Sequence, residues 1–356
     1  MPKRIIFLTP YPNGKAPSQR FRFEQYFNTL KKHNFEIVTR SFLSDKTWKI
    51  IYTNSSFLLK SLGIIGAFFR RFILLFSLWK YDYVFIHREA SMIGPPIFEW
   101  IIAKILRKKY IYDFDDAIWL PNFSQQNAKF QKLKFYGKVN HIIKWADQVT
   151  VGNDFLKEFA LQFNDNVTII PTTIDLEYVH TIECNQNSLP INIGWTGTHT
   201  TLSYVKELIP IIKELELKYD FTFTIISNQP PDFKFNSLRF VQWNKSTEIE
   251  DLSKIQIGVM PLTDNDWAKG KCGFKALQYM ALKIPSIISP VGVNKTIVND
   301  GKNGYLCSSS SEWKKRLEEL ICSKELRIQI GEKGQLTVKE HFSVEAQSDN
   351  YIKLFV

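Results

Sequence analysis

Three lysines and a glycine-bearing turn flank a short apolar segment between residues 269 and 294. The lysines are Lys269, Lys271 and Lys275, in KGKCGFKALQYM, and the turn is SPVGVN. Fixed ammonium groups and free backbone amides both stabilise the negative charge of a phosphate group. Lys271 and Lys275 are four residues apart and Gln278 lies three beyond, so all three share one helix face if the helix starts early. The pattern predicts an anion-binding site.

A second loop with similar chemistry follows the apolar run INIGW. Gly197 would let a ligand approach the backbone closely, and the hydroxyl of Thr198 can cap the next helix. The amides at the N-terminus of that helix would then face a phosphate group. His199 in this loop is a neighbour of the helix cap, and we assign it no catalytic role.

Short runs of β-branched and aromatic residues alternate with helical patterns along the chain, which predicts parallel sheets wrapped by helices. The expected strands of the first half are RIIFL, FEIVTR, YDYVFIH, KKYIYDF, DQVTVGN and NVTIIP. The alternation restarts after the polar stretch DLEYVHTIECNQNSLP, with INIGWTG, DFTFTIIS, LRFVQW, IQIGVMP and PSIISP. We therefore expect an α/β protein with two domains in series. Ligands bind such sheets at the carboxyl ends of the strands, where the lysines and glycine loops fall.

Polar residues also follow two strands of the first half. One expected strand ends in His87, Arg88 and Glu89, and the next is followed by Asp113, Asp115 and Asp116 in DFDD. His87 would contact a bound ligand, or it is a hydrogen-bonded histidine at a strand end. Arg88 and Glu89 would contact a substrate, or they pair with each other and orient a loop. We interpret DFDD as a substrate-side element and expect no metal site there.

The loop after the first strand carries a third polar group. Ser18, Arg20 and Arg22 lie at the start of the first expected helix, where that loop meets the ligand side of the sheet. One of the arginines would contact a phosphate group of a ligand. A solvated helix face is the alternative for Arg22.

The composition is that of a folded protein. The chain has 356 residues, 44% apolar and 23% charged, enough for two hydrophobic cores. The net charge of +11 favours nucleic acid, anionic lipid or phosphorylated metabolites, but no RNA-binding or helix-turn-helix signature supports a nucleic-acid partner. The four cysteines, without CxxC spacing, predict neither a zinc site nor a disulfide framework, which fits a cytoplasmic location. They are Cys184, Cys272, Cys307 and Cys322.

The segment FLLKSLGIIGAFFRRFILLFSLW, residues 57 to 79, is the one candidate for membrane contact. Lys60 and the pair Arg70-Arg71 divide its apolar runs, so it should not cross a bilayer. It is either a buried helix of the first domain or a helix lying in a membrane interface with its arginines on phosphates. The opening MPKRIIFLTPYP is too short for a signal-peptide core and is interpreted as a first strand.

The sequence resembles the retaining glycosyltransferases of family 4. The likeness rests on KCGFKALQYMA, SPVGVN and DGKNGYL in the second half, and on YPNGKAPSQRFRFEQY, HREA and YDFDDAIW in the first. It implies a GT-B fold, with two Rossmann-like domains facing each other across a cleft. The implied domains are an acceptor-binding domain over residues 1–176, completed by a C-terminal helix at 340–356, a linker over 177–190, and a nucleotide-sugar-binding domain over 191–339.

The resemblance also implies roles for individual residues. The implied donor-binding residues are Gly197, Thr198, Lys271, Lys275, Gln278, Val291, Gly292, Val293, Asn294 and Thr296. The implied acceptor-binding residues are Ser18, Arg20, Arg88, Glu89 and Asp113. The implied catalytic residues are His87, Asp115, Asp116, Lys271 and Lys275. The two glutamates that family 4 enzymes usually carry in this block fall on Gly270 and Gln278 here, and Thr296 stands where relatives often have a glutamate.

The implied activity is transfer of a sugar from a UDP- or GDP-sugar, with retention of configuration and without a metal cofactor. The acceptor would be a glycan or a lipid diphosphate of bacterial surface polysaccharide synthesis. The enzyme would be cytoplasmic and would contact anionic lipid at the inner face of the cell membrane. The alternative is a GT-B binding protein that holds a nucleotide sugar or glycan without turnover.

Overall fold

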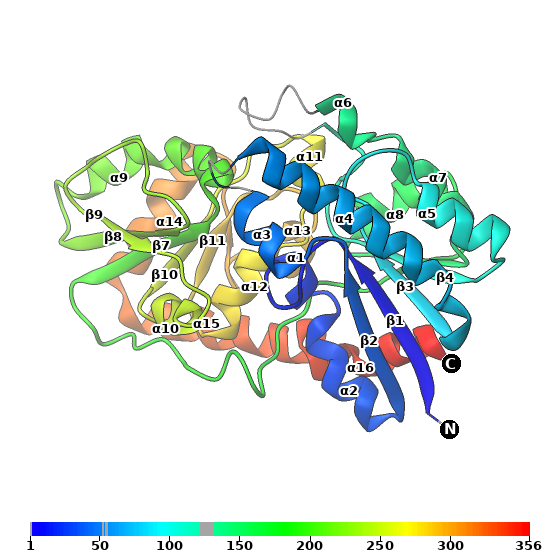
Figure 1. Cartoon of the computed structure of the whole chain (residues 1–356). Coiled ribbons are helices and arrows are strands. Elements are labelled where there is room, and N and C mark those ends of the chain that lie inside the picture. Colours follow the sequence, from blue (N-terminus) through cyan, green and yellow to red (C-terminus); the bar gives the residue numbers. More distant parts are fainter. Residues whose placement is uncertain (1, 52, 54–55, 122–130) are drawn as a thin grey trace. The chain divides into compact units, whose positions relative to one another are not determined.

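The computed structural model describes residues 2–51, 53, 56–121 and 131–356, and the chain folds into two compact units (Figure 1). The first unit comprises Met1–Thr172 and Ser348–Val356, and the second comprises Thr173–Gln347. Each unit contains a parallel six-stranded sheet. The prediction of an α/β protein with two Rossmann-like sheets is therefore confirmed.

The sheet of the first unit has the strand order β2-β1-β3-β4-β5-β6. Its strands are β1 Lys3–Thr9, β2 Phe35–Ser41, β3 Tyr83–His87, β4 Tyr110–Phe114, β5 Gln148–Val151 and β6 Val167–Ile169. Most of their residues are buried, as expected for short β-branched and aromatic runs covered on both faces. The order places β3 between β1 and β4, so the loops that follow these three strands are neighbours.

Helices cover this sheet. They are α1 Pro17–Arg20, η1 Glu24–Tyr26, α2 Phe27–Lys32, α3 Asp45–Ile51, α4 Phe57–Leu75, η2 Leu78–Lys80, α5 Ile97–Trp100, η3 Ile101–Ile105, α6 Gln131–Lys134, α7 Lys138–Trp145 and α8 Asp154–Leu161. The end of the chain adds α16 Val344–Ile352 and η7 Lys353–Phe355. Tyr351 stacks on Tyr26 with ring centroids 4.1 Å apart, and Phe355 packs against Phe7 and Phe85. These aromatic contacts join the C-terminus to the core of the first unit.

The sheet of the second unit has the order β12-β11-β10-β7-β8-β9. Its strands are β7 Ile191–Gly197, β8 Phe221–Ser227, β9 Leu238–Gln242, β10 Ile257–Met260, β11 Ser286–Ile288 and β12 Tyr305–Leu306. Its helices are η5 His199–Leu208, α9 Ile209–Leu215, α10 Glu248–Ser253, α11 Asp266–Lys269, α12 Phe274–Ala281, α13 Asn294–Ile297, α14 Ser310–Cys322, α15 Lys324–Thr337 and η6 Val338–Phe342. The strand order makes β7, β10 and β11 neighbours.

All the strands expected from the sequence are present, and β12 is an addition that the sequence did not suggest because it is only two residues long. The segment 177–190, expected as a linker, contains neither helix nor strand and lies in the second unit. The range 340–356, expected as one helix, is divided among the end of η6, α16 and η7, and only its part from Ser348 onward belongs to the first unit. No helix in the part of the chain that the structure describes is long and apolar enough to cross a membrane.

Candidate functional site

The first group of candidate residues surrounds Lys275 on α12, in the second unit. The Nζ atom of Lys275 lies 4.5 Å from the centroid of the Trp195 ring on β7. A Cβ atom added to Gly197 would lie 2.9 Å from the same Nζ, so the ammonium group rests against the loop after β7. The sequence prediction that Gly197 and Lys275 belong to one site therefore agrees with their geometry.

Lys275 has no acidic partner among the described residues. Neither a hydrogen bond nor an ion pair links its Nζ atom to another described residue, and the side chain is mostly buried. Burial, and to a lesser extent the charge of Lys271, lowers the pKa of Lys275 to about 7. An anionic ligand would reverse this shift, because a negative charge nearby stabilises the ammonium form.

The start of α12 decides whether Lys271 and Lys275 share a helix face. The helix begins at Phe274, because Gly273 adopts a left-handed conformation with φ of 67°. Lys271 therefore precedes the helix and is not on its face, and its Nζ atom lies 5.5 Å from the Trp267 ring centroid. The condition for a shared helix face, an early start of the helix, is therefore not met. The two lysines are nevertheless close enough for the charge of Lys271 to lower the pKa of Lys275.

Gln278 lies three residues after Lys275 on the same helix surface. Only 1% of its surface is exposed, and its Nε2 atom has no hydrogen-bond partner in the described part of the chain. The indole Nε1 of Trp195 also has no partner within the described residues. Buried donors without partners each cost about 1–3 kcal/mol, which a ligand that accepts their hydrogen bonds would recover.

The turn after β11 meets the loop before α12. Gly292 has φ of 55°, and a Cβ atom on it would lie 2.7 Å from the carbonyl oxygen of Lys269, so only glycine fits this approach. Asn294 donates its side-chain N–H to the carbonyl of Ser289 at 2.8 Å and thereby holds the turn. Val291 is buried, whereas Thr296 is exposed on α13. The amide group of Asn294 is therefore engaged within the turn.

Two side chains that the sequence analysis missed support this site. Tyr279 accepts a hydrogen bond from the backbone N–H of Thr196 at 3.0 Å and so connects α12 to β7. Its ring lies over Gly258 of β10, where a Cβ atom would approach to 2.5 Å. Trp195 supplies the apolar surface under Lys275. Their aromatic type and their place on a predicted strand or helix suggested only core positions. Thr198 is the N-cap residue of η5, but its side chain does not cap the helix. Its hydroxyl group lies 2.9 Å from that of Thr200.

A buried charge cluster occupies the ligand side of the first sheet. Asp113 bonds the guanidinium of Arg22 at 2.5 Å, Nδ1 of His87 at 2.8 Å and the hydroxyl of Thr150 at 2.8 Å. Arg22 also donates to the carbonyl of Ile170. Burial alone would raise the pKa of Asp113, but the charge of Arg22 and the hydrogen bond from His87 lower it well below its usual range. Arg22 is only 2% exposed, so the prediction of a solvated helix face is wrong.

His87 is held in one orientation by this cluster. Its Nδ1 atom is hydrogen-bonded to the carboxylate of Asp113 at 2.8 Å, which fixes the orientation of the ring. The Nε2 atom is buried and has no partner in the described residues. Asp113 therefore positions His87, with both carboxylate oxygens engaged inside the protein.

Arg88, Asp115 and Asp116 form a second ion-pair group. Arg88 has φ of 58°, and its side chain contacts Asp115 at 2.7 Å and Asp116 at 2.6 Å. Burial lowers the pKa of Arg88, but the two carboxylates more than offset it and raise the pKa. Glu89 pairs with Lys138 at 2.7 Å. The alternative in which Arg88 and Glu89 pair with each other is therefore wrong.

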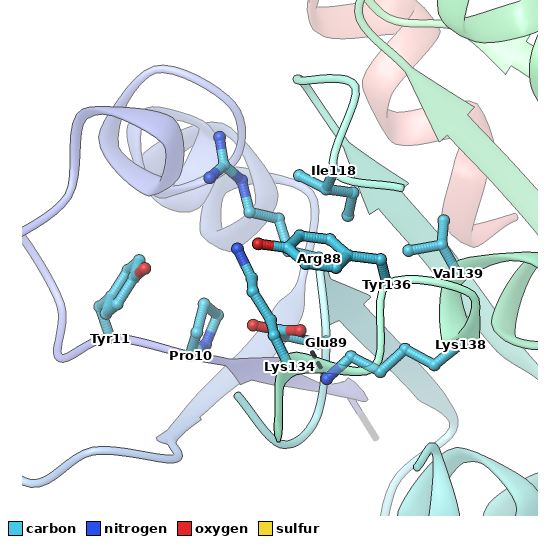
Figure 2. Close-up of a pocket in the computed structure, with 9 residues that line it drawn as sticks. All are labelled: Pro10, Tyr11, Arg88, Glu89, Ile118, Lys134, Tyr136, Lys138 and Val139. Atoms are coloured by element: carbon cyan, nitrogen blue, oxygen red, sulfur yellow. Dashed lines mark ion pairs between the residues drawn. The ribbon is translucent and has the colours of Figure 1, made fainter. Parts of the chain in front are cut away.

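A pocket opens beside these groups in the first unit (Figure 2). It is lined by Pro10, Tyr11, Arg88, Glu89, Ile118, Lys134, Tyr136, Lys138 and Val139. The Nζ atom of Lys134 lies 5.2 Å from the Tyr136 ring centroid, and burial lowers the pKa of Lys134. Gln19 holds the backbone of Tyr11, which lines the pocket. Its side-chain oxygen accepts from the N–H of Tyr11, and its Nε2 atom donates to the carbonyl of Tyr11, both at 3.0 Å.

The sequence analysis found Arg88 and Glu89 of this pocket and missed the tyrosines and lysines. The stretch KFYGKVN was the available signal, since it places basic and aromatic residues just before a helix. Ser18 and Arg20 lie on α1, and the Arg20 guanidinium lies 4.9 Å from the Phe21 ring centroid. They do not line the pocket.

Comparison with known proteins supports the fold. Residues 191–323 match the family model of glycosyl transferases group 1, and no curated protein sequence matches the chain. Sucrose-phosphate synthase from Thermosynechococcus elongatus is similar at a TM-score of 0.71 and 13% identity, covering 99% of this chain and 98% of that chain. HepE from Anabaena in complex with UDP has a TM-score of 0.62 at 14% identity, covering 99% of each chain.

The catalytic domain of Starch Synthase IV from Arabidopsis thaliana, bound to ADP and acarbose, has a TM-score of 0.70 at 11% identity. That comparison covers 100% of this chain and 99% of the other. The matched range includes Gly197, Lys275, Gln278 and Gly292. The chain thus has the GT-B fold of these glycosyltransferase structures, and residues 191–323 of its second unit match the model of glycosyl transferases group 1.

Proposed function

We propose that the protein is a retaining glycosyltransferase of family 4 that moves a hexosyl group from a nucleotide diphosphate sugar to a glycan or lipid-linked acceptor. The observation that carries this proposal is Lys275. Its ammonium group lies at the carboxyl end of the second sheet, without an acidic partner among the described residues, inside the domain matched to glycosyl transferases group 1. Such a group is suited to a diphosphate.

The donor would be bound by the loops around Lys275. Lys271 and Lys275 would neutralise the diphosphate, and the backbone amides near Gly197, Thr198 and Gly292 would add hydrogen bonds to it. The unpartnered Nε2 of Gln278 would donate to a ribose or sugar hydroxyl. The complexes of Anabaena HepE with UDP and of the Arabidopsis starch synthase with ADP support a nucleoside diphosphate sugar as the donor class.

The lysines would also act during the reaction. Breaking the bond between the sugar and the diphosphate builds negative charge on the leaving phosphate, and fixed cations stabilise that charge more in the transition state than in the ground state. Because the pKa of Lys275 is lowered to about 7 in the free protein, donor binding at neutral pH would be accompanied by uptake of a proton. We propose that this site needs no metal ion.

The acceptor would bind in the first unit, at the pocket of Figure 2. Tyr11 and Tyr136 offer ring surfaces on which a sugar can pack, and Lys134 offers a charge. His87, oriented by Asp113, remains our candidate for steadying the reacting sugar or the acceptor hydroxyl.

The other acceptor-side residues would act indirectly or at the rim. Asp115 and Asp116 would position Arg88 rather than contact the sugar. Ser18 and Arg20 on α1 would contact the part of the acceptor that extends beyond the pocket. The proposed setting is the cytoplasmic side of a bacterial cell membrane, in surface polysaccharide synthesis.

The first test is a thermal-shift screen with UDP, GDP and their sugars, because a ligand that binds only the folded state raises the melting temperature. A donor found in this way would then be used, radiolabelled in its sugar, to measure transfer or hydrolysis. Lys275→Ala should lower turnover by about 100-fold or more, comparable to loss of an oxyanion-stabilising donor. Lys302→Ala, at an exposed lysine outside the site, is the matched control.

Two results would oppose the proposal in different ways. Binding of a nucleotide sugar without transfer or hydrolysis would favour the alternative, a GT-B binding protein that has no turnover. Activity that disappears in EDTA and returns with magnesium would show that the site requires a metal ion and would make Asp115 and Asp116 the first candidate ligands.

A further inference from the structure

Helix α4 presents large apolar side chains to solvent. The exposed residues follow one another at intervals of four and three, so they form a continuous stripe along one side of the helix and its C-cap. They are Leu58, Leu62, Ile65, Phe69, Phe72 and Phe76, each between 50% and 71% exposed. A helix on the surface of a globular protein normally has polar residues at these positions.

The opposite side of α4 holds the charge. Arg71 is 3% exposed, and its guanidinium donates to the backbone carbonyls of Thr9, Arg40 and Ala90 at 2.9–3.1 Å. Ala67 is buried beside it and belongs to a core cluster of the first unit. The helix thus places an arginine inside and phenylalanines outside. The hypothesis that Arg71 contacts lipid phosphates is therefore wrong. The alternative of a buried helix of the first domain holds only for the side of α4 that carries Ala67, Arg71 and Leu75.

The apolar surface continues beyond α4. Helix α5 packs against α4, with the rings of Phe68 and Phe98 5.8 Å apart, and the two helices lie next to each other in Figure 1. Further exposed apolar residues lie on η2, on α5 and after it. We define the α4 face as the apolar stripe of α4 together with five further exposed residues, Trp79, Ile97, Trp100, Ile105 and Leu106. An apolar surface of this extent marks an interaction site.

Basic residues adjoin this face, and exposed acidic residues are absent from its described segments. Between residues 56 and 81 the sequence contains no aspartate or glutamate, and between 97 and 110 it contains only Glu99, which is buried. Arg70, Lys80, Lys104 and Arg107 are exposed next to apolar members of the face. The Nζ atom of Lys80 lies 5.5 Å from the Trp79 ring centroid.

We propose that the α4 face docks the protein on the surface of an anionic lipid bilayer. The helix would lie in the plane of the interface with its apolar stripe among the acyl chains, and the adjoining cations would contact lipid phosphates. Trp79 and Trp100 fit this position, because tryptophan favours the membrane interface. A second copy of the chain is a poorer occupant, since the same cations would then face each other across a symmetric interface.

The proposal does not depend on sugar transfer, and its test needs no substrate. The full-length protein is sedimented at low salt with vesicles of phosphatidylcholine alone and with vesicles that also contain phosphatidylglycerol. We expect recovery in the pellet with the mixed vesicles, and less recovery as salt is raised. Failure of this binding would leave the proposed transferase activity unaffected, so the two proposals are tested separately.

Two variants examine the two parts of the α4 face. The double substitution Phe69→Asp and Phe72→Asp should weaken vesicle binding by at least about tenfold, since it removes two exposed rings that would enter the acyl chains and adds negative charge. Leu217→Asp, at a leucine that is 83% exposed in the second unit, is the matched control and should bind normally. Lys104→Gln with Arg107→Gln should weaken binding to the mixed vesicles by about thirtyfold, or about fivefold per charge.

Three outcomes would overturn the proposal. These are no recovery with either kind of vesicle at low salt, unchanged binding in both double variants, or loss of binding in the Leu217→Asp control as well. A dimer in analytical ultracentrifugation that becomes a monomer in the aspartate variant, together with no vesicle binding, would assign the face to a second copy. Circular dichroism of each variant verifies that the exposed substitutions leave the fold intact.

Discussion

Replacing Lys275 by Met should stabilise the ligand-free protein and abolish its response to nucleoside diphosphates. In the folded protein the pKa of Lys275 is lowered from 10.5 to about 7. The unfolded chain therefore binds more protons than the folded chain between pH 7 and pH 10.5, and stability must rise with pH across that range. The Met side chain keeps the apolar contact with Trp195 and removes the proton-binding group.

The size of the effect follows from linkage. A fully shielded lysine with this pKa would lower the free energy of unfolding by about 4 kcal/mol at pH 7 and by about 2 kcal/mol at pH 9. Because Lys275 retains some exposure, we expect half of this effect, or about 2 kcal/mol at pH 7 and 1 kcal/mol at pH 9. The Lys275→Met variant should therefore be the more stable protein, and its advantage should shrink as pH rises.

Urea unfolding at pH 7, 8 and 9, followed by far-UV circular dichroism, measures this difference. Lys302→Met, at an exposed lysine, is the matched control and should have the same free energy of unfolding as the unmodified protein at each pH. Thermal shifts with UDP and GDP should be present in the control and absent in Lys275→Met. Parallel pH dependences for Lys275→Met and the unmodified protein would refute the inference that a desolvated ammonium group lies at this position.

The remaining predictions concern three buried side chains. Gln278→Leu should raise the KM for a nucleotide sugar by about tenfold, which steady-state kinetics would show, and should not destabilise the free protein, because the Nε2 donor it removes has no partner in the described residues. Asp113→Asn should lower the free energy of unfolding by about 3–5 kcal/mol at pH 7, because it leaves Arg22 buried without its counter-charge. Since the folded pKa of Asp113 is depressed, its stabilisation is present above about pH 4 and is lost as pH falls, so the variant should show a flatter acid limb in urea unfolding. Arg71→Met should lower the thermal midpoint by several degrees in calorimetry, because three buried carbonyls lose their donor.

Local patterns in the sequence were enough to predict the strands and the edge of the sheet at which the proposed donor-binding loops lie. Strand and helix periodicities depend on near neighbours in the chain, so the runs around β1 to β11 could be identified without any tertiary contact. The rule that ligands bind at the carboxyl ends of parallel strands then put Gly197, Lys275 and Gly292 on one edge of a sheet. The structure has the Gly197 loop against Lys275 and the Gly292 turn against Lys269.

Contacts between distant residues decided the rest. Arg22 and Asp113 are 91 positions apart, so nothing in either local stretch shows that they form one buried pair that also holds His87. The helix start at Phe274 depends on the left-handed Gly273, which packs against Ile297 of α13. The burial of Arg22 and the start of α12 could not be predicted from the sequence, because both depend on residues of other elements.

The two sides of α4 also show that the sequence alone does not decide which side chains are buried. From the sequence, residues 57 to 79 are an apolar segment with two adjacent arginines, and its periodicity does not tell which side faces the core. Only the tertiary structure places the carbonyls of Thr9, Arg40 and Ala90 where Arg71 can bond all three. Because Arg71 donates to these buried carbonyls, its side of α4 faces the core. Phe69 and Phe72 lie on the opposite side of the helix and are therefore exposed.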